Sequence, residues 1–387
     1  MHYDHDLSFE YNNPTRIIYG EDSVKEIGLV VDGLNCTKAL IVTDEGVLKA
    51  GLADKVTEAL GSRYAGTFDR CTQDSGFHLV DEGAGFARGK DAECLVSVGG
   101  GSVIDTAKGI AIVMKEGGKL ADYADIQMLS RPQTPHIVVP TTAGTGSEVT
   151  CTAVIKDHQR NVKELFADYH IIPNRAILDP VMTAGLPPLL TAGTGMDAFT
   201  HAVEAIHTMQ SEPIADAMAL HAIRLIVNNL PRCVSDGSDL VARGHQLLAA
   251  TMAGIAFSNA QVGLGHAMAH SVGALFNVPH GLANSILLPH VMLFNLESCA
   301  HRYALIAEAM GLDVRGLPAA EAGKAAIEAV WDLTKMIGLP QKLREANVPE
   351  EGLPEAAELS LSDGSIIYNP HPISEAKEVL AVFRAAW

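Results

Sequence analysis

Residues 93–114 read ECLVSVGGGSVIDTAKGIAIVM, and this stretch decides the fold of the first half of the chain. The apolar run at 93–98 predicts a buried strand, and the residues after the glycines follow a helical pattern. Between them lie Gly99, Gly100, Gly101 and Ser102. Glycines at a strand-to-helix turn let backbone amides approach an anion at the positive end of the helix. The pattern indicates a pyrophosphate-binding loop, although three glycines can equally form a tight turn that binds nothing.

The alternation of strand and helix continues on both sides of this loop. Short apolar runs at 38–44, 136–140 and 174–180 are separated by longer amphipathic stretches. This order is typical of an α/β layer with a mainly parallel sheet. We therefore expect an α/β domain over residues 1–185.

After Pro187 and Pro188 the pattern becomes helical. Apolar residues recur at intervals of three and four residues, which is the spacing of amphipathic helices. The segments with this spacing are 194–209, 214–230, 244–257 and 301–311. Tandem prolines interrupt helices and restrict the residue before them. We therefore predict a domain boundary here and an all-helical domain over residues 186–387.

The composition restricts the classes of partner. The chain has 387 residues, 48% of them hydrophobic and 19% charged, which suits two folded domains. Its formal net charge of −18 would repel nucleic acids and anionic lipid surfaces, so a small-molecule partner is favoured. No apolar run reaches the ~20 residues of a membrane helix, and we expect a cytoplasmic protein. The six cysteines form no CxxC pair, which argues against a disulfide framework or a zinc ribbon.

A second loop follows the run at 136–140. Residues 141–148 read TTAGTGSE, a flexible, hydroxyl-rich turn after a predicted strand. Open α/β sheets hold nucleotides at the carboxyl ends of their strands, so the two loops together favour a nucleotide site. Asp44 ends another run, where a carboxylate can accept hydrogen bonds from the ribose of NAD and repel the extra phosphate of NADP. A helix N-cap is the alternative interpretation of Asp44.

The helical half contains pairs of potential metal ligands. Asp197 and His201 are four residues apart, so a helix would project both side chains from one face, and His266 and His270 repeat the spacing. With 16 histidines in the chain, any one such pair can arise by chance. The combination of pairs is the stronger signal for a shared ion.

His280 adds a further imidazole, between Pro279 and Gly281, which indicate a turn. The neighbours of these residues are small, which we interpret as space for an ion and a substrate. A carboxylate with several imidazoles suits iron(II) or zinc rather than the all-oxygen shells of calcium and magnesium. The absence of a thiolate favours iron.

The ordered set of motifs resembles the iron-containing (group III) alcohol dehydrogenase family over roughly residues 9–310. The motifs are GGGSVIDTAKGIA at 99–111, PTTAGTGSEVT at 140–150, GMDAFTHAVEA at 195–205, GLGHAMAHSVG at 263–273 and NVPHGLANSILLPHV at 277–291. The resemblance implies the dehydroquinate synthase-like architecture of that family: a Rossmann-like dinucleotide-binding domain, an all-helical domain, and an active site in the cleft between them.

The resemblance also implies the roles of individual residues. The metal ligands are expected to be Asp197, His201, His266 and His280, which we call the ligand set. The expected cofactor-binding residues are Asp44, Asp74, Gly99, Gly100, Gly101, Ser102, Thr141, Thr142, Thr145, Ser147, Lys163 and Met182. Phe257 is expected to wall the substrate pocket and His270 to belong to the catalytic site, as a proton relay, an alternative ligand or a supporting residue.

Two segments depart from the family pattern. Asp74 lies in the run Thr72–Gly76, where many relatives carry Asn-Pro, so an acid replaces an amide that faces the cofactor. Residues 340–387 are less diagnostic, and the family uses this part of the chain to shape substrate access. The identity of the substrate therefore stays open.

The function expected from these features is hydride transfer between NAD(H) and a small alcohol or its aldehyde or ketone, at a bound Fe²⁺ or Zn²⁺. A polyol dehydrogenase of the glycerol, propanediol or lactaldehyde type and a hydroxyacid-oxoacid transhydrogenase are alternatives on the same scaffold, and dehydroquinate synthase is a further branch. A non-catalytic protein that binds NAD and metal is a remote alternative. The family also suggests a homodimer or a larger homo-oligomer.

Overall fold

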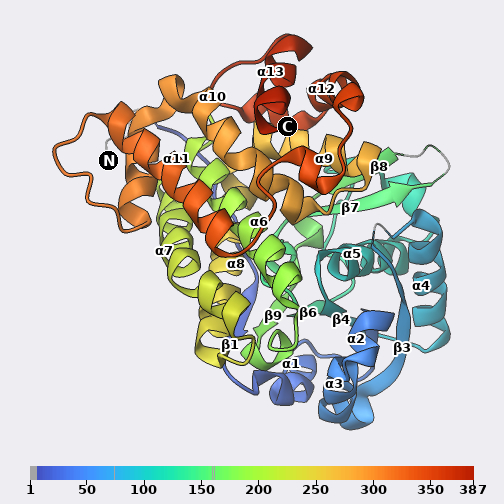
Figure 1. Ribbon diagram of the computed structural model, residues 1–387. Helices are drawn as coiled ribbons and strands as arrows, with labels where there is room; N and C mark the ends of the chain where they lie inside the picture. The colour runs from blue at the N-terminus through green and yellow to red at the C-terminus, as the bar shows by residue number, and fades with distance from the viewer. Residues whose placement is uncertain (1–6, 74, 159, 161) are drawn as a thin grey trace. The chain divides into compact units, whose positions relative to one another are not determined.

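The apolar runs of the first half form one sheet in a computed structural model that describes residues 7–73, 75–158, 160 and 162–387 (Figure 1). The strands are β1 (Arg16–Tyr19), β2 (Ala39–Asp44), β3 (Tyr64–Cys71), β4 (Cys94–Gly99), β6 (His136–Pro140) and β9 (Arg175–Leu178). They lie in the order β1-β9-β6-β4-β2-β3, and every neighbouring pair is parallel. The predicted parallel sheet is confirmed, and the four predicted runs correspond to β2, β4, β6 and β9.

Helices cover both faces of this sheet. They are α1 (Ile27–Asp32), α2 (Glu45–Lys49), α3 (Leu52–Leu60), α4 (Phe77–Gly89) and α5 (Gly101–Glu116), with short 3-10 helices at η1 (Ser23–Glu26), η2 (Gly61–Arg63), η3 (Leu120–Tyr123), η4 (Ser147–Val149), η5 (Tyr169–Ile171) and η6 (Pro180–Met182). Leu40 and Val42 of β2 pack with α4 and α5, whereas Ala39 and Ile41 pack with α1, α2 and α3. This alternation between two apolar cores explains why the central strands are apolar throughout.

A second, smaller sheet contains β5 (Asp125–Ile126), β7 (Thr152–Asp157) and β8 (Val162–Ala167) in the order β5-β8-β7. β7 and β8 form an antiparallel pair, and β5 is parallel to β8. Half-exposed strands such as these carry mixed polar and apolar residues, which is why no apolar run marks them in the sequence.

The second half is helical, as predicted. Its elements are α6 (Pro188–His207), α7 (Pro213–Ser235), α8 (Leu240–Ala260), α9 (Leu264–Phe276), α10 (His280–Ala309), α11 (Ala319–Met336), α12 (Leu353–Leu361) and α13 (Ala376–Ala386), with η7 (Leu343–Ala346), η8 (Glu350–Gly352) and η9 (Gly364–Tyr368). Residues 187–387, all of which the structure describes, contain no strand. α6 packs against α7, α8 and α10.

The chain divides into two units, Asn13–Leu186 and Pro187–Trp387 with the segment before Asn13. The ranges 1–185 and 186–387 stay a prediction; in this division the described residues 7–12 group with the helical unit. A hydrogen bond of 2.8 Å from the Asn12 amide to Oδ1 of Asn259 attaches this segment to α8.

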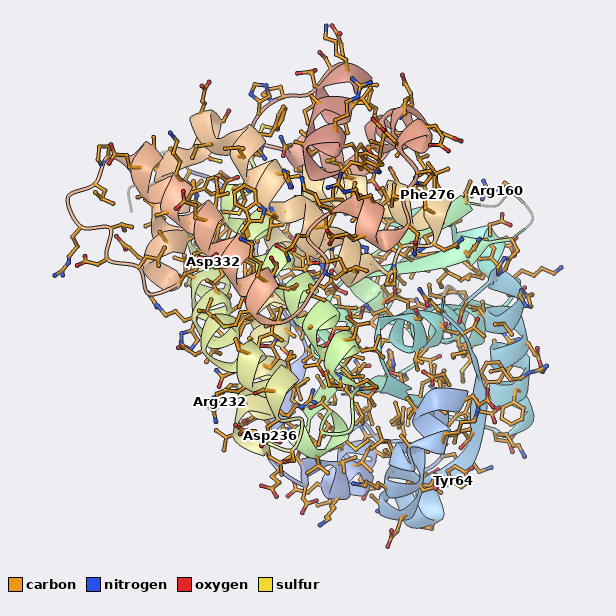
Figure 2. All side chains as sticks on the ribbon, viewed as in Figure 1. Tyr64, Arg160, Arg232, Asp236, Phe276 and Asp332 are labelled. Atoms are coloured by element: carbon orange, nitrogen blue, oxygen red, sulfur yellow. The ribbon has the colours of Figure 1, made fainter. Side chains whose placement is uncertain are left out.

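Charged side chains are exposed on the surface of the helical unit. Arg232, Asp236 and Asp332 are exposed examples (Figure 2). Among the described residues, no single helix is long and apolar enough to cross a membrane, although α8 and α9 pass such a test as a pair bent by 105°.

Candidate metal centre and nucleotide loops

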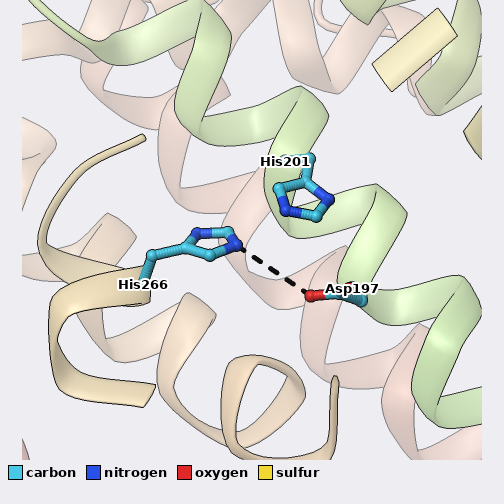
Figure 3. Close-up of side chains that lie close together, drawn as sticks. All are labelled: Asp197, His201 and His266. Carbon is cyan, nitrogen blue, oxygen red and sulfur yellow. Dashed lines mark ion pairs between the residues drawn. The ribbon is translucent and has the colours of Figure 1, made fainter. Parts of the chain in front are cut away.

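Three members of the ligand set meet inside the helical unit. Asp197 and His201 lie one turn apart on α6, His266 lies on α9, and all three side chains are buried. One ligand atom from each lies within 4.8 Å of the others, and Nε2 of His266 is 3.9 Å from Oδ1 of Asp197 (Figure 3). The spacing of Asp197 and His201 therefore places both side chains on the face of α6 that meets α9.

His280 completes the group from a third helix. Its Nε2 lies 3.4 Å from Oδ1 of Asp197, and 39% of its side chain is exposed. The predicted turn at this position is wrong, since His280 is the first residue of α10 and Pro279 is its N-cap. Gly281 is needed for close packing, because a Cβ there would lie 2.2 Å from the carbonyl oxygen of Gly193 on α6. The small residue thus brings two helices together and does not leave open space.

Glu204, which the sequence analysis missed, holds His266 in place. It lies on α6, seven residues after Asp197, and its carboxylate accepts hydrogen bonds from the amides of Gly263 (3.0 Å) and Gly265 (2.7 Å). Its Oε2 is 2.5 Å from Nδ1 of His266. Because a carboxylate accepts, Nδ1 carries the proton and the lone pair of Nε2 faces Asp197, as in the carboxylate-histidine-metal arrangement. The i, i+7 spacing from Asp197 was the available signal.

The side-chain nitrogen of Asn284, Nδ2, lies at the centre of the group. It is 2.8 Å from Oδ1 of Asp197, 3.3 Å from Nε2 of His266 and 3.2 Å from Nε2 of His280. Three acceptors thus surround a nitrogen that has two hydrogens to give. The Oδ1 atom of Asn284 is buried with no hydrogen-bond partner among the described residues. An excess of converging lone pairs, with an orphaned amide oxygen beside them, fits a bound cation.

The charge states of this cluster suit a metal. Burial raises the pKa of Asp197, but attraction to His201, His280 and His266 outweighs it, and the pKa is lower than usual. Burial, with repulsion from the neighbouring histidines, holds the pKa of His266 well below its ordinary value. An ionised carboxylate and a neutral imidazole are the forms that bind metal ions.

His270 and Phe257 flank the ligand set. His270 follows His266 by one turn of α9, and its ring lies parallel to that of His280 with centroids 5.2 Å apart. Phe257, on α8, stacks on His201 with centroids 4.1 Å apart. Nδ1 of His270 is 2.7 Å from Oδ2 of Asp363, a residue the sequence analysis did not single out. Burial raises the pKa of Asp363, but the hydrogen bond and charge of His270 reverse this, so that the net pKa is lowered.

In the α/β unit, the two predicted nucleotide loops lie side by side. β4 and β6 are neighbours, with Gly99 opposite Pro140, and the amide of Thr141 donates to the carbonyl of Gly99 over 3.0 Å. A Cβ at Gly100 would lie 3.2 Å from the side chain of Thr142, and one at Gly101 would lie 2.7 Å from that of Thr145. The glycines therefore let the second loop approach the start of α5, which begins at Gly101.

The remaining cofactor residues are dispersed. Asp44 ends β2, next to β4, and its Oδ1 accepts from the amide of Val47 over 2.9 Å, so it is an N-cap in this structure. Ser147 and Met182 are buried in η4 and η6. Lys163 is exposed on β8 of the smaller sheet. Asp74 lies outside the described residues.

The helical part of the first motif supports the second loop. Nζ of Lys108 is fully buried and donates to Thr150 O, Thr150 Oγ1 and Thr152 O at 2.9, 3.0 and 2.7 Å. Oδ2 of Asp105 accepts from the amide of Val154 over 3.0 Å. Burial lowers the pKa of Lys108 and raises that of Asp105. The motif thus attaches the chain after the threonine-rich loop to α5.

The α/β unit has adjacent glycine- and threonine-rich loops at the ends of parallel strands, and the helical unit has a cluster of one carboxylate and three histidines. These features are expected of a metal-dependent, nucleotide-using oxidoreductase. The sequence model of iron-containing alcohol dehydrogenase matches residues 14–180, and that of the C-terminal part of the Fe-containing alcohol dehydrogenase family matches residues 191–387. The chain belongs to the iron-containing alcohol dehydrogenase family. The predicted family, fold class and class of enzyme are confirmed.

Individual relatives are similar over nearly their whole length. The chain is 41% identical over 385 residues to 1,3-propanediol dehydrogenase of Klebsiella pneumoniae, which covers 98% of this chain and 99% of that protein. It is 37% identical over 377 residues to NAD-dependent methanol dehydrogenase of Bacillus methanolicus, covering 96% and 98% of the two chains. The crystal structure of a 1,3-propanediol oxidoreductase matches with a TM-score of 0.96 at 40% identity, covering 98% of this chain and 100% of that one.

Proposed function

We propose that this alcohol dehydrogenase oxidises small primary alcohols or diols with NAD at an iron(II) ion held by the ligand set. The observation that carries the proposal is the convergence of Asp197, His266 and His280 on one point, occupied here by the amide nitrogen of Asn284. A donor set of one carboxylate and three imidazoles without thiolate suits iron(II), and zinc accepts the same ligands.

The side chains around the ligand set have separate tasks. When bound, the iron supplies Lewis acidity that makes an alcohol hydroxyl easier to deprotonate. Glu204 keeps the proton on Nδ1 of His266, so that Nε2 stays available. His270, with 37% of its side chain exposed, accepts the proton of the alcohol and passes it to water. Phe257 covers one face of His201 and excludes water from that side.

The α/β unit holds the dinucleotide in this proposal. NAD, when bound, accepts the hydride. The amides at the start of α5 and the hydroxyls of Thr141, Thr142 and Thr145 bind its pyrophosphate. Asp44 binds the ribose through Oδ2, since its Oδ1 already caps α2. Lys163, Ser147, Met182 and Asp74 remain proposed contacts.

The size of the substrate is proposed from relatives of known specificity. Proteins named for 1,3-propanediol and for methanol share 41% and 37% of this sequence. A short diol is one candidate, supported by the relative named for 1,3-propanediol, and a short alcohol with one hydroxyl is the other, supported by the relative named for methanol. NAD reduction measured over C2 to C6 alcohols and diols, after metal analysis, separates these substrates.

The central experiment removes one imidazole at a time. His266→Ala and His280→Ala should lower iron content and activity together, because each leaves an incomplete ligand set. His301→Ala is the matched control, since His301 lies exposed on α10, beyond the kink at Cys299 and 21 residues after His280. Metal-stripped protein that kept full turnover would refute the proposal, as would iron content unchanged in both variants.

Location and assembly are proposed from the cysteines and from the edge of the sheet. All six cysteines are free, which suits a reducing compartment such as the cytoplasm. The edge strand β1 carries exposed Ile17 and Tyr19, and apolar edges of this kind pair between chains. We therefore propose a homodimer or a larger homo-oligomer, which size-exclusion chromatography with light scattering tests.

A further inference from the structure

We infer that Asp363 is a positioning residue that fixes the tautomer and the orientation of the His270 ring. The inference rests on the proposed role of His270 in proton transfer. It assigns a task to the C-terminal segment that follows α12, which family resemblance connects only with substrate access.

The contact itself determines the tautomer. Nδ1 of His270 is 2.7 Å from Oδ2 of Asp363, and the side chains are 37% and 21% exposed. A carboxylate can only accept, so Nδ1 carries a proton, and in the neutral ring Nε2 then keeps its lone pair. A general base needs that lone pair on the nitrogen that meets the substrate proton. The opposite tautomer would place the lone pair against Asp363.

The contact also restricts rotation of the ring. A histidine on the exposed side of a helix can adopt several rotamers. Here the ring lies parallel to His280, with an interplanar angle of 13° and centroids 5.2 Å apart, and edge-on to His266 at 6.0 Å. The bond to Asp363 selects this one orientation, in which the ring stays beside the ligand set.

Asp363 is held firmly enough for this task. Its Oδ1 accepts from the amide of Ser365 over 2.8 Å and caps η9. At the end of η9, Asn369 exchanges two hydrogen bonds with Asn295 of α10, of 2.9 and 2.8 Å, and accepts from the amide of Leu264 at the start of α9. The segment is therefore attached to the helices that carry His270 and His280.

A contact between α9 and α12, the helix that precedes the segment, provides a control. The hydroxyls of Ser360 and Ser271 lie 2.9 Å apart, next to His270 in the sequence but without contact to its ring. Ser360→Ala removes a contact with α9 from α12, the helix that leads into the segment, while leaving the pair of Asp363 and His270 intact. It should leave kcat, KM and iron content unchanged.

The competing explanation is that Asp363 only caps η9, and a double-mutant cycle separates the two. Asp363→Asn keeps a capping oxygen but can point a donor at Nδ1, and it should lower kcat about tenfold or more while KM changes less than about twofold. His270→Ala should lose at least as much. If Asp363 acts through His270, the double variant should be no slower than His270→Ala alone.

Losses that multiply in the double variant, or a loss of iron from Asp363→Asn, would overturn the inference. Nitrogen-15 NMR of histidine-labelled, zinc-loaded protein gives a readout that needs no turnover. The signal missing from His270→Ala should report a protonated Nδ1 in the wild type and a changed tautomer in Asp363→Asn, and an unchanged signal would also overturn it. If no alcohol reduces NAD in the wild type, the proposed function fails while this test still decides the role of Asp363.

Discussion

Glu204 should control how tightly the ligand set binds its ion, although it is not itself a ligand. Its carboxylate takes hydrogen bonds from the amides of Gly263 and Gly265 and from Nδ1 of His266. Glu204→Gln keeps the volume of the side chain, but removes the charge and replaces one acceptor oxygen with a donor. In one orientation the amide nitrogen faces Nδ1 of His266 and this bond is lost; in the other the oxygen stays at Oε2 but carries no full charge, so the bond to His266 is weakened.

The size of the effect follows from the bond that is lost. A hydrogen bond to a charged group contributes about 1.5–3 kcal/mol. Removing the outer partner of a ligating histidine weakens metal binding about 10- to 100-fold. At about 1.4 kcal/mol for each factor of ten, this is about 1.4–2.8 kcal/mol of binding free energy. The two estimates agree, so most of the free energy of the bond between Glu204 and His266 should be lost from metal binding when the bond is removed.

The assay is equilibrium competition for iron(II) or zinc between the protein and a chelator, without oxygen for iron. Glu212→Gln is the matched control, because Glu212 is also buried and accepts from two backbone amides, those of Ile214 (2.7 Å) and Ala215 (2.6 Å), but makes no hydrogen bond with any histidine in the described part of the chain. Both variants should lose stability in urea, and only Glu204→Gln should lose affinity. An unchanged Kd in Glu204→Gln, or an equal change in Glu212→Gln, would refute the reasoning.

Three further perturbations test other parts of the molecule. Asp44→Asn removes the charge but keeps a good N-cap, so kcat/KM with NADP relative to NAD should rise about tenfold or more; an unchanged ratio contradicts the role of Asp44. Gly281→Ala should lower stability by about 1–3 kcal/mol and lower the iron content, because the added Cβ would lie 2.2 Å from the carbonyl oxygen of Gly193. Gly273→Ala is the control and should be tolerated, because its Cβ would lie 3.5 Å from the nearest atom. Burial lowers the pKa of His136 from 6.5 to about 3, so the folded protein favours the neutral ring. The free energy of unfolding therefore has its full value above pH 6.5 and decreases as the pH falls towards 3, because the unfolded chain takes up a proton that the folded protein does not. Between pH 7 and pH 5 this proton uptake should lower the free energy of unfolding, measured in urea, by about 2 kcal/mol. The His136→Gln variant should lack this part of the loss.

The parallel sheet could be predicted because its strands are buried on both faces. β4 and β6 are completely buried, and a strand with two apolar faces is apolar at every position. β7 and β8 form a hairpin with partly exposed residues such as Val154 and Leu165, so they carry no such run. Single-sequence patterns therefore identify the strands of the core and miss those at the surface.

The metal cluster could be predicted in part because helical spacing is a local property. Asp197 and His201 share a face of α6 whatever the rest of the chain does. Spacing could not show that His280 begins a helix, because the proline and glycine beside it are equally typical of a turn. Only the position of the Gly193 carbonyl on α6 shows that Gly281 serves the packing of two helices.

Helical spacing also relates the candidate ligands to two of the residues that support them, Glu204 and Asn284. α6 continues its ligand face at Glu204, and α10 carries Asn284 one turn after His280. Glu204 and Asn284 each lie on the same face of the helix as a candidate ligand. Their polar side chains therefore contact a candidate ligand that comes from another helix. Asp363 has no such local signal, because it is 93 residues from His270 and reaches it only through the attachment of η9 to α9 and α10. Spacing can therefore point to candidate ligands and to supporting residues on their own helices, whereas supports from distant segments require the folded chain.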